Sequence, residues 1–386
     1  MPDISSLSCV EISKKNLIHN ITLFRNLAKK GTKFSVAIKG NAYGHGEIQV
    51  TKILEKHVDY FQINSLAELE LLRKASRKRA FLFGYVQKSA LSEAVKLGCI
   101  LAIFSMEQLK ALDKTARKLK IKQEIHIPVD AHLGREGFLL NDLPKLFKEL
   151  KKYKYIKVSG IYAHFANIED AASAGDFTHA KKQIDEYEKA VKVAHEFGFV
   201  NLDTHISATS GLLAYEKKVG VHPIIRLGIG VYGMWPSLGL RDTNENSKFK
   251  LEPVLSWKTR IAQIKTLAKG STIGYGLTFK TKKKTKIAII PVGYADGLDR
   301  GLSNKGKVLI GGTYCKILGR VSMNMFVVDI NHLERVLVED EVVILGSQAG
   351  KRGRSIVTAE DMASLLDTIN YEITARISPL LPRIVS

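Results

Sequence analysis

Short apolar runs alternate with amphipathic stretches over roughly the first 233 residues of the chain. The apolar runs are rich in strand-forming residues, and there are eight of them: 34–39, 60–65, 80–85, 100–105, 124–130, 157–165, 203–207 and 224–233. Stretches with helical spacing, such as LAELELLRKASRK and AKKQIDEYEKAVKVAHEFG, lie between them. Eight strand–helix units in about 200–250 residues predict a TIM barrel. A doubly wound open sheet is the alternative, but it is normally shorter, and no GxGxxG motif opens a helix here.

Two of the expected helices carry a start signal. Ser65 is followed three residues later by Glu68, and Ser105 by Gln108. In such a capping box the hydroxyl accepts a hydrogen bond from the third backbone N–H, and the longer side chain reaches back to the cap residue. We therefore expect helices to begin directly after Ser65 and Ser105.

The pattern changes near residue 250, where strand-like segments broken by glycine turns replace the alternation. Examples are EPVLSWKTRIAQIKTL, TKIAIIPVGYADG and DEVVILG, and a late helix is expected over 358–367. The sequence therefore predicts an α/β TIM-barrel domain over residues 1–242 and a mainly β C-terminal domain over residues 243–386.

The composition is that of an ordinary globular protein, with 45% hydrophobic and 25% charged residues among 386. No apolar run reaches the ~18–20 residues of a membrane span, and the first residues lack the basic-then-apolar pattern of a secretory signal. Cys9, Cys99 and Cys315 are widely spaced without a CxxC motif, which fits a reducing compartment and argues against zinc. We therefore expect a cytoplasmic protein without a metal site.

The formal net charge of +21 raises the question of a polyanionic partner, because clustered Lys and Arg attract phosphate backbones. Most of the lysines, however, fall in segments such as LRKASRKR, where a surface helix would leave them in solvent. The dense run KTKKKTK (280–286) lies between two strand-like segments. The chain has no aromatic RNA-binding motif and no helix-turn-helix pairing. We therefore attribute the charge to composition or to attraction for small anions, and we predict neither a nucleic-acid nor a membrane partner.

Polar residues recur where the predicted barrel strands end. Each of them alone is more often structural: a snorkelling lysine, a hydrogen-bonded core histidine, an arginine paired with an acid, or a polar turn. Catalytic groups of a TIM barrel gather at the C-terminal ends of its strands, and unrelated polar residues would scatter over both ends. The convergence at one end therefore favours a site made of Lys39, Arg135, His164, Thr209, Ser210 and Arg226.

The loops after the seventh and eighth strands suit a phosphate group. The sequences SATSG (207–211) and RLGIG (226–230) supply hydroxyls and glycine N–H groups there. Lys39 on the other side could join a phosphorylated aldehyde as a Schiff base, and pyridoxal phosphate is such a molecule. A sugar-phosphate aldolase with a Schiff-base lysine fits these residues almost as well.

The motif AIKGNAYGHG (37–46) resembles the cofactor-attachment motif of the alanine racemases, which are fold-type III pyridoxal-phosphate enzymes. Further motifs follow in the order and spacing of that family: GIYAHFA, DAHLGREG, RLGIGVYG, GYGLTF, PVGYADG, LGRVSMNMFVVDI and TINYEITARI. The resemblance spans both domains, whereas single-domain pyridoxal-phosphate barrels lack the β-domain motifs. It implies a homodimer with shared active sites that uses pyridoxal 5'-phosphate to interconvert L- and D-alanine for peptidoglycan.

The resemblance also implies roles for individual positions. Lys39 would hold the cofactor and act as one base, and Tyr275 of the partner subunit would act as the other. Arg226 would bind the pyridine nitrogen, His164 would link it to Tyr275, and Arg135 would contact the phenolic oxygen. The remaining implied contacts are, for the phosphate, Tyr43, Thr209, Gly228, Ile229 and Tyr371 with Ser210 beside them and, for the substrate, Arg135, Tyr294, Met323 and Asn324.

Two positions depart from the family pattern. Pro128 stands where the family commonly has a lysine, carbamylated in some members, that orients the arginine, so Arg135 must find another partner or a bound anion. Asn324 stands where the family usually has an aspartate. Loss of this carboxylate suggests, as an alternative, a serine or broader-specificity racemase, although Asn keeps the hydrogen-bonding shape. A non-catalytic pyridoxal-phosphate carrier is a third possibility, and the presence of Tyr275 argues against it.

Overall fold

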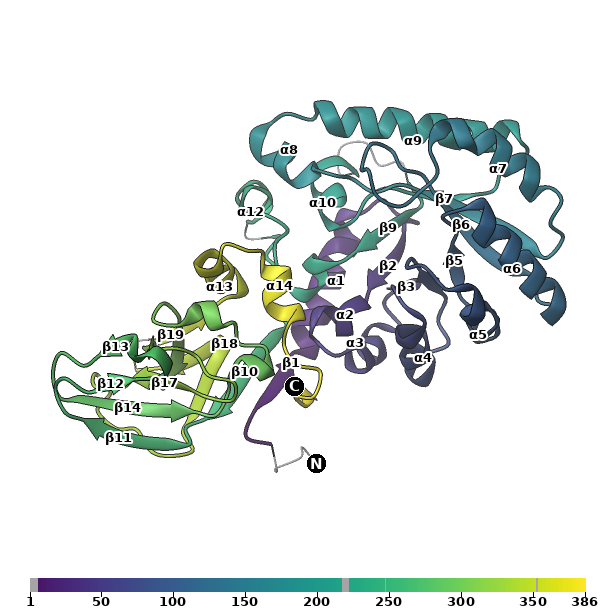
Figure 1. Ribbon diagram of the computed structural model, residues 1–386. Coiled ribbons are helices and arrows are strands. Elements are labelled where there is room, and N and C mark those ends of the chain that lie inside the picture. The colour runs from purple at the N-terminus through teal and green to yellow at the C-terminus, as the bar shows by residue number, and fades with distance from the viewer. Residues whose placement is uncertain (1–5, 217–221, 247, 352) are drawn as a thin grey trace. The chain divides into compact units, whose positions relative to one another are not determined.

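The computed structural model describes residues 6–216, 222–246, 248–351 and 353–386 (Figure 1). The chain divides into two compact units. The barrel unit comprises Leu17–Lys39 and Val50–Glu252, and the β unit comprises Met1–Asn16, Gly40–Gln49 and Pro253–Ser386. The segment directly after Lys39 therefore makes its contacts with the C-terminal part of the chain.

The barrel unit is built on a parallel sheet whose strands follow one another in chain order. All eight predicted runs form strands: β2 (Lys33–Ala37), β3 (Tyr60–Ile63), β4 (Ala80–Leu82), β5 (Ile100–Ala102), β6 (Gln123–Pro128), β7 (Ile156–Tyr162), β8 (Asp203–His205) and β9 (Ile224–Leu227). The strand β2 pairs with β9, and an isolated bridge between Ala208 and Arg226 links β9 to the segment after β8. The sheet is therefore a nearly closed barrel, which confirms the predicted TIM barrel over the open sheet.

Helices follow the strands of this unit and surround them in Figure 1, among them α4 (Leu66–Ala75), α5 (Leu91–Leu97), α6 (Met106–Leu119), α7 (Leu143–Leu150) and α9 (Thr178–Glu196). Ser65 forms the expected capping box with Glu68. Of the capping box expected at Ser105, only one of the two hydrogen bonds forms. The Ser105 hydroxyl accepts from the Gln108 N–H at 3.1 Å, but the Gln108 side chain accepts from the N–H of Phe104 and not from that of Ser105.

The barrel interior is filled by large side chains from several strands. Tyr60, Phe81, Ile100 and Ile224 form one apolar cluster, and none of them is more than 4% exposed. Burial of such side chains stabilises the fold by about 1.5–3 kcal/mol each. Among the polar side chains described below, those of His126, His205 and Arg226 are buried in this unit, so that protein atoms, and not solvent, set their positions.

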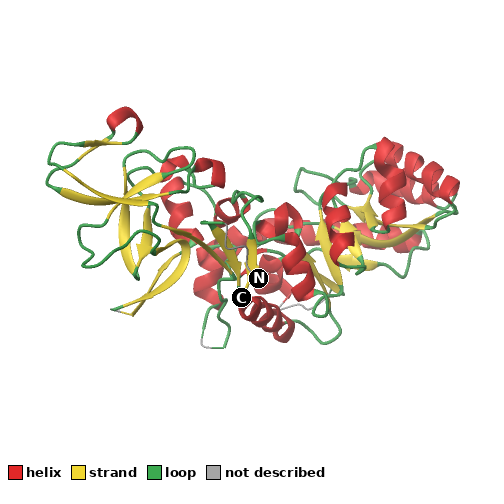
Figure 2. Ribbon diagram, turned by 90° about the horizontal axis from the view of Figure 1, so that it is seen from below, coloured by secondary structure: helices red, strands yellow, loops and turns green. Residues whose placement is uncertain are grey.

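The β unit is mainly strand, as predicted. Its larger sheet contains β1 (Cys9–Ile12), β10 (Leu255–Arg260), β11 (Gln263–Leu267), β14 (Thr285–Ile290), β15 (Lys307–Ile310), β16 (Thr313–Leu318), β17 (Phe326–Asp329), β18 (Glu341–Gly350) and β20 (Arg383–Val385), with β19 (Gly353–Val357) paired to β18. The strands β12 (Thr272–Ile273) and β13 (Phe279–Lys280) form a separate pair. The helices α13 (Ala359–Leu366) and α14 (Asn370–Ala375) follow β19. Figure 2 shows the contrast between this strand-rich unit and the helix-rich barrel unit.

The first strand of the chain belongs to this C-terminal sheet. The strand β1 pairs antiparallel with β10 and parallel with β20. Val10 and Ile12 are fully buried there. Both ends of the chain therefore meet within one sheet.

Within the described residues, no helix combines the length and the apolarity needed to cross a membrane.

Candidate active site

Lys39 lies two residues beyond the end of β2, at the mouth of the barrel. It lines a pocket of about 440 Å³ that is formed entirely by the barrel unit, together with Gln62, Asn64, Phe83, Gly84, Tyr85, Phe104, Arg135, Glu136, Tyr162, His164 and Arg226. Four predicted residues, Lys39, Arg135, His164 and Arg226, thus come together in one cavity. A pocket of this size accommodates a small organic ligand.

The surroundings of Lys39 favour its neutral amine. The ammonium reaches the solvent of the pocket, yet most of its environment is protein. Partial desolvation lowers the pKa of Lys39 below its usual range, and the positive charges of Arg135 and Arg226 lower it further. The negative charges of Glu68 and Glu136 raise the pKa and oppose part of this effect. A lysine with a lowered pKa is both a better nucleophile and a better base near neutral pH.

Arg226 lies at the centre of a buried hydrogen-bond network, and it is only 5% exposed. Its Nη1 donates to Nδ1 of His205 at 2.5 Å, and its Nη2 donates to Nδ1 of His164 at 3.1 Å. The same Nη2 donates to the carbonyl oxygens of Ala163 and Ile206 at 2.7 and 3.1 Å. Burial lowers the pKa of Arg226 to about 10, so the guanidinium stays charged near neutrality.

The imidazoles beside Arg226 are neutral. Since Nδ1 of His205 accepts from Arg226, the proton of His205 resides on Nε2, which donates to Nδ1 of His126 at 2.8 Å. Burial lowers the pKa of His126 and of His164 to about 3, and it lowers the pKa of His205 as well. Arg226 is thus the only charged member of this row of four side chains.

Arg135 has a carboxylate partner. Its Nε donates to Oε2 of Glu136, and its Nη2 donates to Oε1 at 2.9 Å, which makes a bidentate ion pair. Pro128, at the end of β6, contributes only its carbonyl oxygen, which accepts from the Phe138 N–H at 2.9 Å. Glu136 therefore supplies the partner that the sequence leaves open at Pro128.

The loop that carries Arg135 is held on both sides. Oδ1 of Asp130 accepts from the N–H groups of Leu133 and Gly134 at 3.0 and 2.8 Å, which caps the turn. From α9, Nε2 of the buried Gln183 donates to the Ala131 oxygen at 2.7 Å and to the His164 oxygen at 3.1 Å. One amide therefore ties together the loops that follow β6 and β7.

The predicted phosphate residues of the barrel unit lie where β9 meets the segment that follows β8. The hydroxyl of Thr209 accepts from the Gly228 N–H at 3.1 Å, and both residues are buried together with Ile229. Ser210 differs, because its hydroxyl donates to Glu169. Burial raises the pKa of that carboxyl group. Thr209, Gly228 and Ile229 thus lie together as expected, whereas the Ser210 hydroxyl donates its hydrogen bond to the Glu169 carboxyl group.

The other two predicted phosphate residues belong to the β unit. The rings of Tyr43 and Tyr371 lie 5.9 Å apart, centroid to centroid. Tyr43 ends a turn in which Gly40, Asn41 and Ala42 also have left-handed φ values between 53° and 62°. Burial raises the pKa of Tyr43 to about 12, so its phenol stays protonated and able to donate.

The predicted second base and three of the predicted substrate residues, Tyr294, Met323 and Asn324, are exposed in the β unit. Tyr275 is 71% exposed, Met323 is 54% exposed, and Asn324 and Tyr294 are also exposed. The loops of Tyr294 and Met323 are joined, because the Tyr294 N–H donates to the Ser322 oxygen and the Ala295 N–H to the Met323 oxygen, at 3.1 and 3.0 Å.

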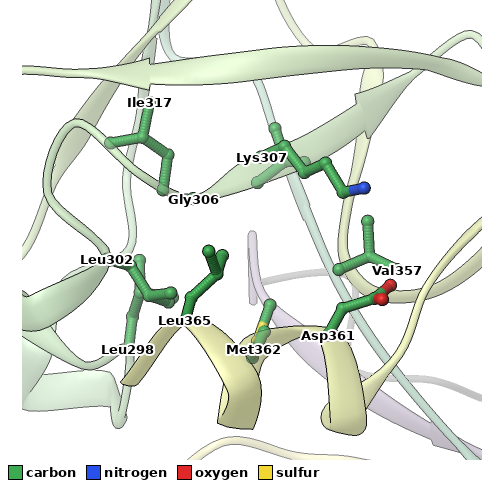
Figure 3. Close-up of a pocket in the computed structure, with 10 residues that line it drawn as sticks. Leu298, Leu302, Gly306, Lys307, Ile317, Val357, Asp361, Met362 and Leu365 are labelled. Atoms are coloured by element: carbon green, nitrogen blue, oxygen red, sulfur yellow. The ribbon is translucent and has the colours of Figure 1, made fainter. Parts of the chain in front are cut away.

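The β unit also contains a small apolar gap beneath α13, which Figure 3 shows. Leu302, Ile317 and Met362 face it, with Lys307 and Asp361 at its edge. Its volume of about 10 Å³ is roughly the space of one water molecule, so it cannot hold a cofactor. Among the described residues, no group of three or more His, Cys, Asp or Glu is placed to hold a metal ion.

Sequence reasoning missed Glu136, Gln183, His126 and His205. The two histidines carry a detectable signal, since each stands inside an apolar strand where a solvated side chain would not fit. Gln183 stands on a helix among ordinary surface residues, and its role depends on loops far away in sequence. Glu136 follows Arg135 directly, and neighbouring opposite charges are too common to indicate a functional pair.

A TIM barrel with a lysine, a paired arginine and neutral imidazoles at the ends of its strands has the arrangement of an enzyme. Family models match both parts of the chain: the N-terminal domain of alanine racemase matches residues 12–236, and the C-terminal domain matches residues 254–385. The chain belongs to the alanine racemase family, which is a family of isomerases. The resemblance found in the motifs is thereby confirmed.

Individual relatives match over nearly their whole length. The chain is 35% identical to the alanine racemase of Leptospira interrogans serovar copenhageni, over 98% of this chain and 95% of that protein. It is 35% identical to the alanine racemase of Cutibacterium acnes, over 99% of both. The structure of alanine racemase from Clostridium difficile 630 matches with a TM-score of 0.91 at 31% identity, covering 100% of this chain and 97% of that one. The structure from Bacillus anthracis with bound L-Ala-P matches with a TM-score of 0.90 at 28% identity, covering 99% and 96%.

Proposed function

We propose that this chain interconverts L- and D-alanine with pyridoxal 5'-phosphate bound through Lys39. The observation that carries the proposal is Lys39 itself, an amine of lowered pKa in a pocket that also contains Arg226. The pocket fits the cofactor: it offers a primary amine for an aldehyde, a guanidinium for a ring nitrogen, and the hydroxyl of Tyr162, which has no hydrogen-bond partner among the described residues. The relatives are alanine racemases, and from them we take alanine as the substrate.

Pyridoxal phosphate supplies the electron sink that makes the α-hydrogen of an amino acid acidic. Racemisation then needs one proton-handling group on each face of the α-carbon. We assign Nζ of Lys39 to one face, because a lowered pKa makes its neutral amine more available as a base. We assign the phenol of Tyr275 to the other face.

Arg226 would hold the ring nitrogen of the cofactor without giving up a proton. Its pKa of about 10 keeps the guanidinium protonated in the neutral range, and His164 and His205 accept its hydrogen bonds. Both imidazoles are neutral, so the row of histidines fixes the direction of Arg226 without adding charge. His164 would connect Arg226 to Tyr275.

The remaining site residues take the roles that the resemblance implies. Tyr43, Thr209, Gly228, Ile229 and Tyr371 would hold the phosphate, with Ser210 beside them. Arg135 would contact the phenolic oxygen of the cofactor and the substrate, and Met323, Tyr294 and Asn324 would face the substrate.

The proposal requires a second copy of the chain. Tyr275 is 71% exposed and Leu277 is 66% exposed, so both side chains are available to a partner molecule. We propose a homodimer in the cytoplasm in which each copy donates Tyr275 to the site of the other. The D-alanine formed would serve peptidoglycan synthesis.

The deciding experiment is incubation of the purified protein and cofactor with L-alanine in deuterated water. We expect the wild type to form D-alanine and to incorporate deuterium at the α-carbon. Lys39→Ala, which lacks the amine, should form neither product. Tyr275→Phe should still exchange the α-hydrogen of one enantiomer at the lysine face, but its racemisation should fall by about 10²- to 10⁴-fold.

The same incubations separate the alternatives. A higher kcat/KM for L-serine than for L-alanine would instead identify a serine racemase, the specificity suggested by Asn324. Absence of α-deuterium with every amino acid would reduce the chain to a cofactor carrier. Racemisation of alanine by Lys39→Ala would sink the proposal altogether.

A further inference from the structure

The mouth of the barrel has one acidic side chain whose role no sequence motif explains. Among the described residues that line the pocket, Glu136 is the one carboxylate, and it shares the pocket with three cationic side chains: Lys39, Arg135 and Arg226. Glu136 is the immediate neighbour of Arg135 in sequence, and both of its oxygens accept from that guanidinium.

The geometry of the pair determines which donors of Arg135 remain for a ligand. The guanidinium has five N–H donors in a rigid plane. Glu136 occupies the edge formed by Nε and Nη2. The fork formed by Nη1 and the second proton of Nη2 is left over, and such a fork matches the two oxygens of a carboxylate or one anionic oxygen.

The backbone around Glu136 is held in place. Gly137 has φ +137°, and a Cβ there would lie 2.5 Å from the Asp130 backbone nitrogen, so the chain passes very close to itself. The Phe138 N–H donates to the Pro128 oxygen at 2.9 Å, and the Asp130 N–H donates to the Phe138 oxygen at 3.1 Å. Glu136 therefore projects from an anchored loop.

We propose that Glu136 is a positioning residue that orients Arg135 and presents its free fork to an anionic oxygen of the bound ligand. The inference rests on the proposed function for its consequence in catalysis. The ion pair itself adds little to stability, because the Arg135 side chain is 57% exposed and solvent screens the attraction. The ion pair matters because it fixes the orientation of the Arg135 guanidinium. A misplacement of about 1 Å in a binding group costs about 100-fold in rate.

The kinetic test is a double-mutant cycle on the holoenzyme. Glu136→Ala should lower kcat/KM for alanine by about 10- to 100-fold, and Glu136→Gln by less, because the amide oxygen can still accept one N–H. In an Arg135→Ala background, Glu136→Ala should have no further effect, because Glu136 acts through Arg135. An undiminished effect of Glu136→Ala in that background would overturn the proposal.

Chemical rescue separates positioning from a merely structural role. Acetate should restore part of kcat/KM to Glu136→Ala, because it can replace the missing carboxylate beside Arg135, and it should not stimulate the wild type. Glu149→Gln is the matched control: Glu149 also accepts from a neighbouring cation, Lys152, but it is absent from the lining of the pocket. A loss of kcat/KM that acetate leaves unchanged in Glu136→Ala would contradict the proposal.

A readout independent of turnover completes the test. Phenylglyoxal modifies arginines, and peptide mapping by mass spectrometry measures the rate at Arg135. We expect faster modification in Glu136→Ala and in Glu136→Gln than in the wild type and in Glu149→Gln, and equal rates would refute the pairing. If the wild type fails to racemise alanine, the proposed function fails, and the modification rates still decide the role of Glu136.

Discussion

At the scale of single residues, the most constrained stretch follows Lys39 directly. Asn41, Ala42 and Tyr43 all have φ near +53°, a region that costs non-glycine residues about 1–2 kcal/mol each. The cost is offset by hydrogen bonds, among them Asn41 Oδ1 accepting from the Glu47 N–H at 2.9 Å. Arg383 donates to the Gly44 oxygen at 2.9 Å. Backbone strain held in place by its surroundings is a frequent property of functional sites.

Replacement of Gly44 tests how tightly this turn packs against α14. A Cβ at Gly44 would lie 1.9 Å from the Thr374 oxygen, so α14 or the turn would have to move. We expect Gly44→Ala to lower the free energy of unfolding by about 3 kcal/mol or more. Gly31→Ala is the control, because Gly31 also has a positive φ, +90°, but nothing lies within 4 Å of its Cβ. That control should lose about 1 kcal/mol. Denaturant unfolding measures both, and equal losses would show that the close approach does not matter.

The sequence predicts some site residues and not others for a physical reason. Lys39, Arg226 and His164 stand at strand ends, and strands are recognisable from local apolar runs, so their convergence follows from the barrel. The pairing of Arg135 with Glu136 depends instead on the path of a loop, which no periodicity encodes. The engagement of Ser210 by Glu169 likewise depends on two segments that are distant in sequence.

At the scale of elements, α9 acts on the site through the side chain of Gln183, among others. Oε1 of Gln183 accepts from the Ala166 N–H at 2.8 Å, and its Nε2 donates to the oxygens of Ala131 and His164. The helix therefore sets the spacing between two loops at the mouth of the barrel. Hydrophobic periodicity predicts α9 itself but gives no indication of this function.

Replacement of Gln183 tests this link. Gln183→Leu leaves three backbone groups without their partner, at about 1–3 kcal/mol each before relaxation, and we expect losses of both stability and kcat/KM. Gln123→Leu is the matched control, because Gln123 is also buried and donates to two backbone oxygens, but at the start of β6. It should lose stability and keep kcat/KM. A full kcat/KM in folded Gln183→Leu would show that the loops do not need the amide.

The exact ends of the strands and their partners were also not predictable from local apolar patterns. The run 224–233 is apolar apart from Arg226 and its glycines, yet β9 ends at Leu227 and residues 229–232 form a 3-10 turn. The break lies at Gly228, whose ψ of −113° is outside the range of a strand, and no local apolar pattern marks that position. The membership of Cys9–Ile12 in the C-terminal sheet was also beyond prediction, since pairing across most of the chain leaves no local pattern.

At the scale of the whole molecule, buried neutral histidines couple folding to pH. Burial lowers the pKa of His45 to about 4 and that of His126 and His164 to about 3, whereas an unfolded chain has values near 6.5. Below pH 6.5 the unfolded state therefore binds more protons than the folded one. Stability contributed by these groups is present above about pH 6.5 and is lost as the pH falls toward 4 and 3.

This coupling predicts the acid limb of the stability curve. The free energy of unfolding in urea should fall below pH 6.5 with a slope of up to about 1.4 kcal/mol per pH unit for each such histidine. His126→Asn, which has no titrating ring, should show a shallower slope at the cost of some stability at neutral pH. A flat profile between pH 4.5 and 6.5 would contradict the neutral state of these imidazoles.

The pairing of β1 with β10 and β20 imposes an order on folding during synthesis. The ribosome releases Cys9–Ile12 first, but both partner strands come from the last third of the chain. Apart from the pairing of β2 with β9, the barrel strands pair with neighbours that follow soon in sequence, so we expect them to form before β1 has its partners. A fragment that lacks β10 and β20 thus leaves β1 without its partners, and its bare strand edge is open to pairing with other chains.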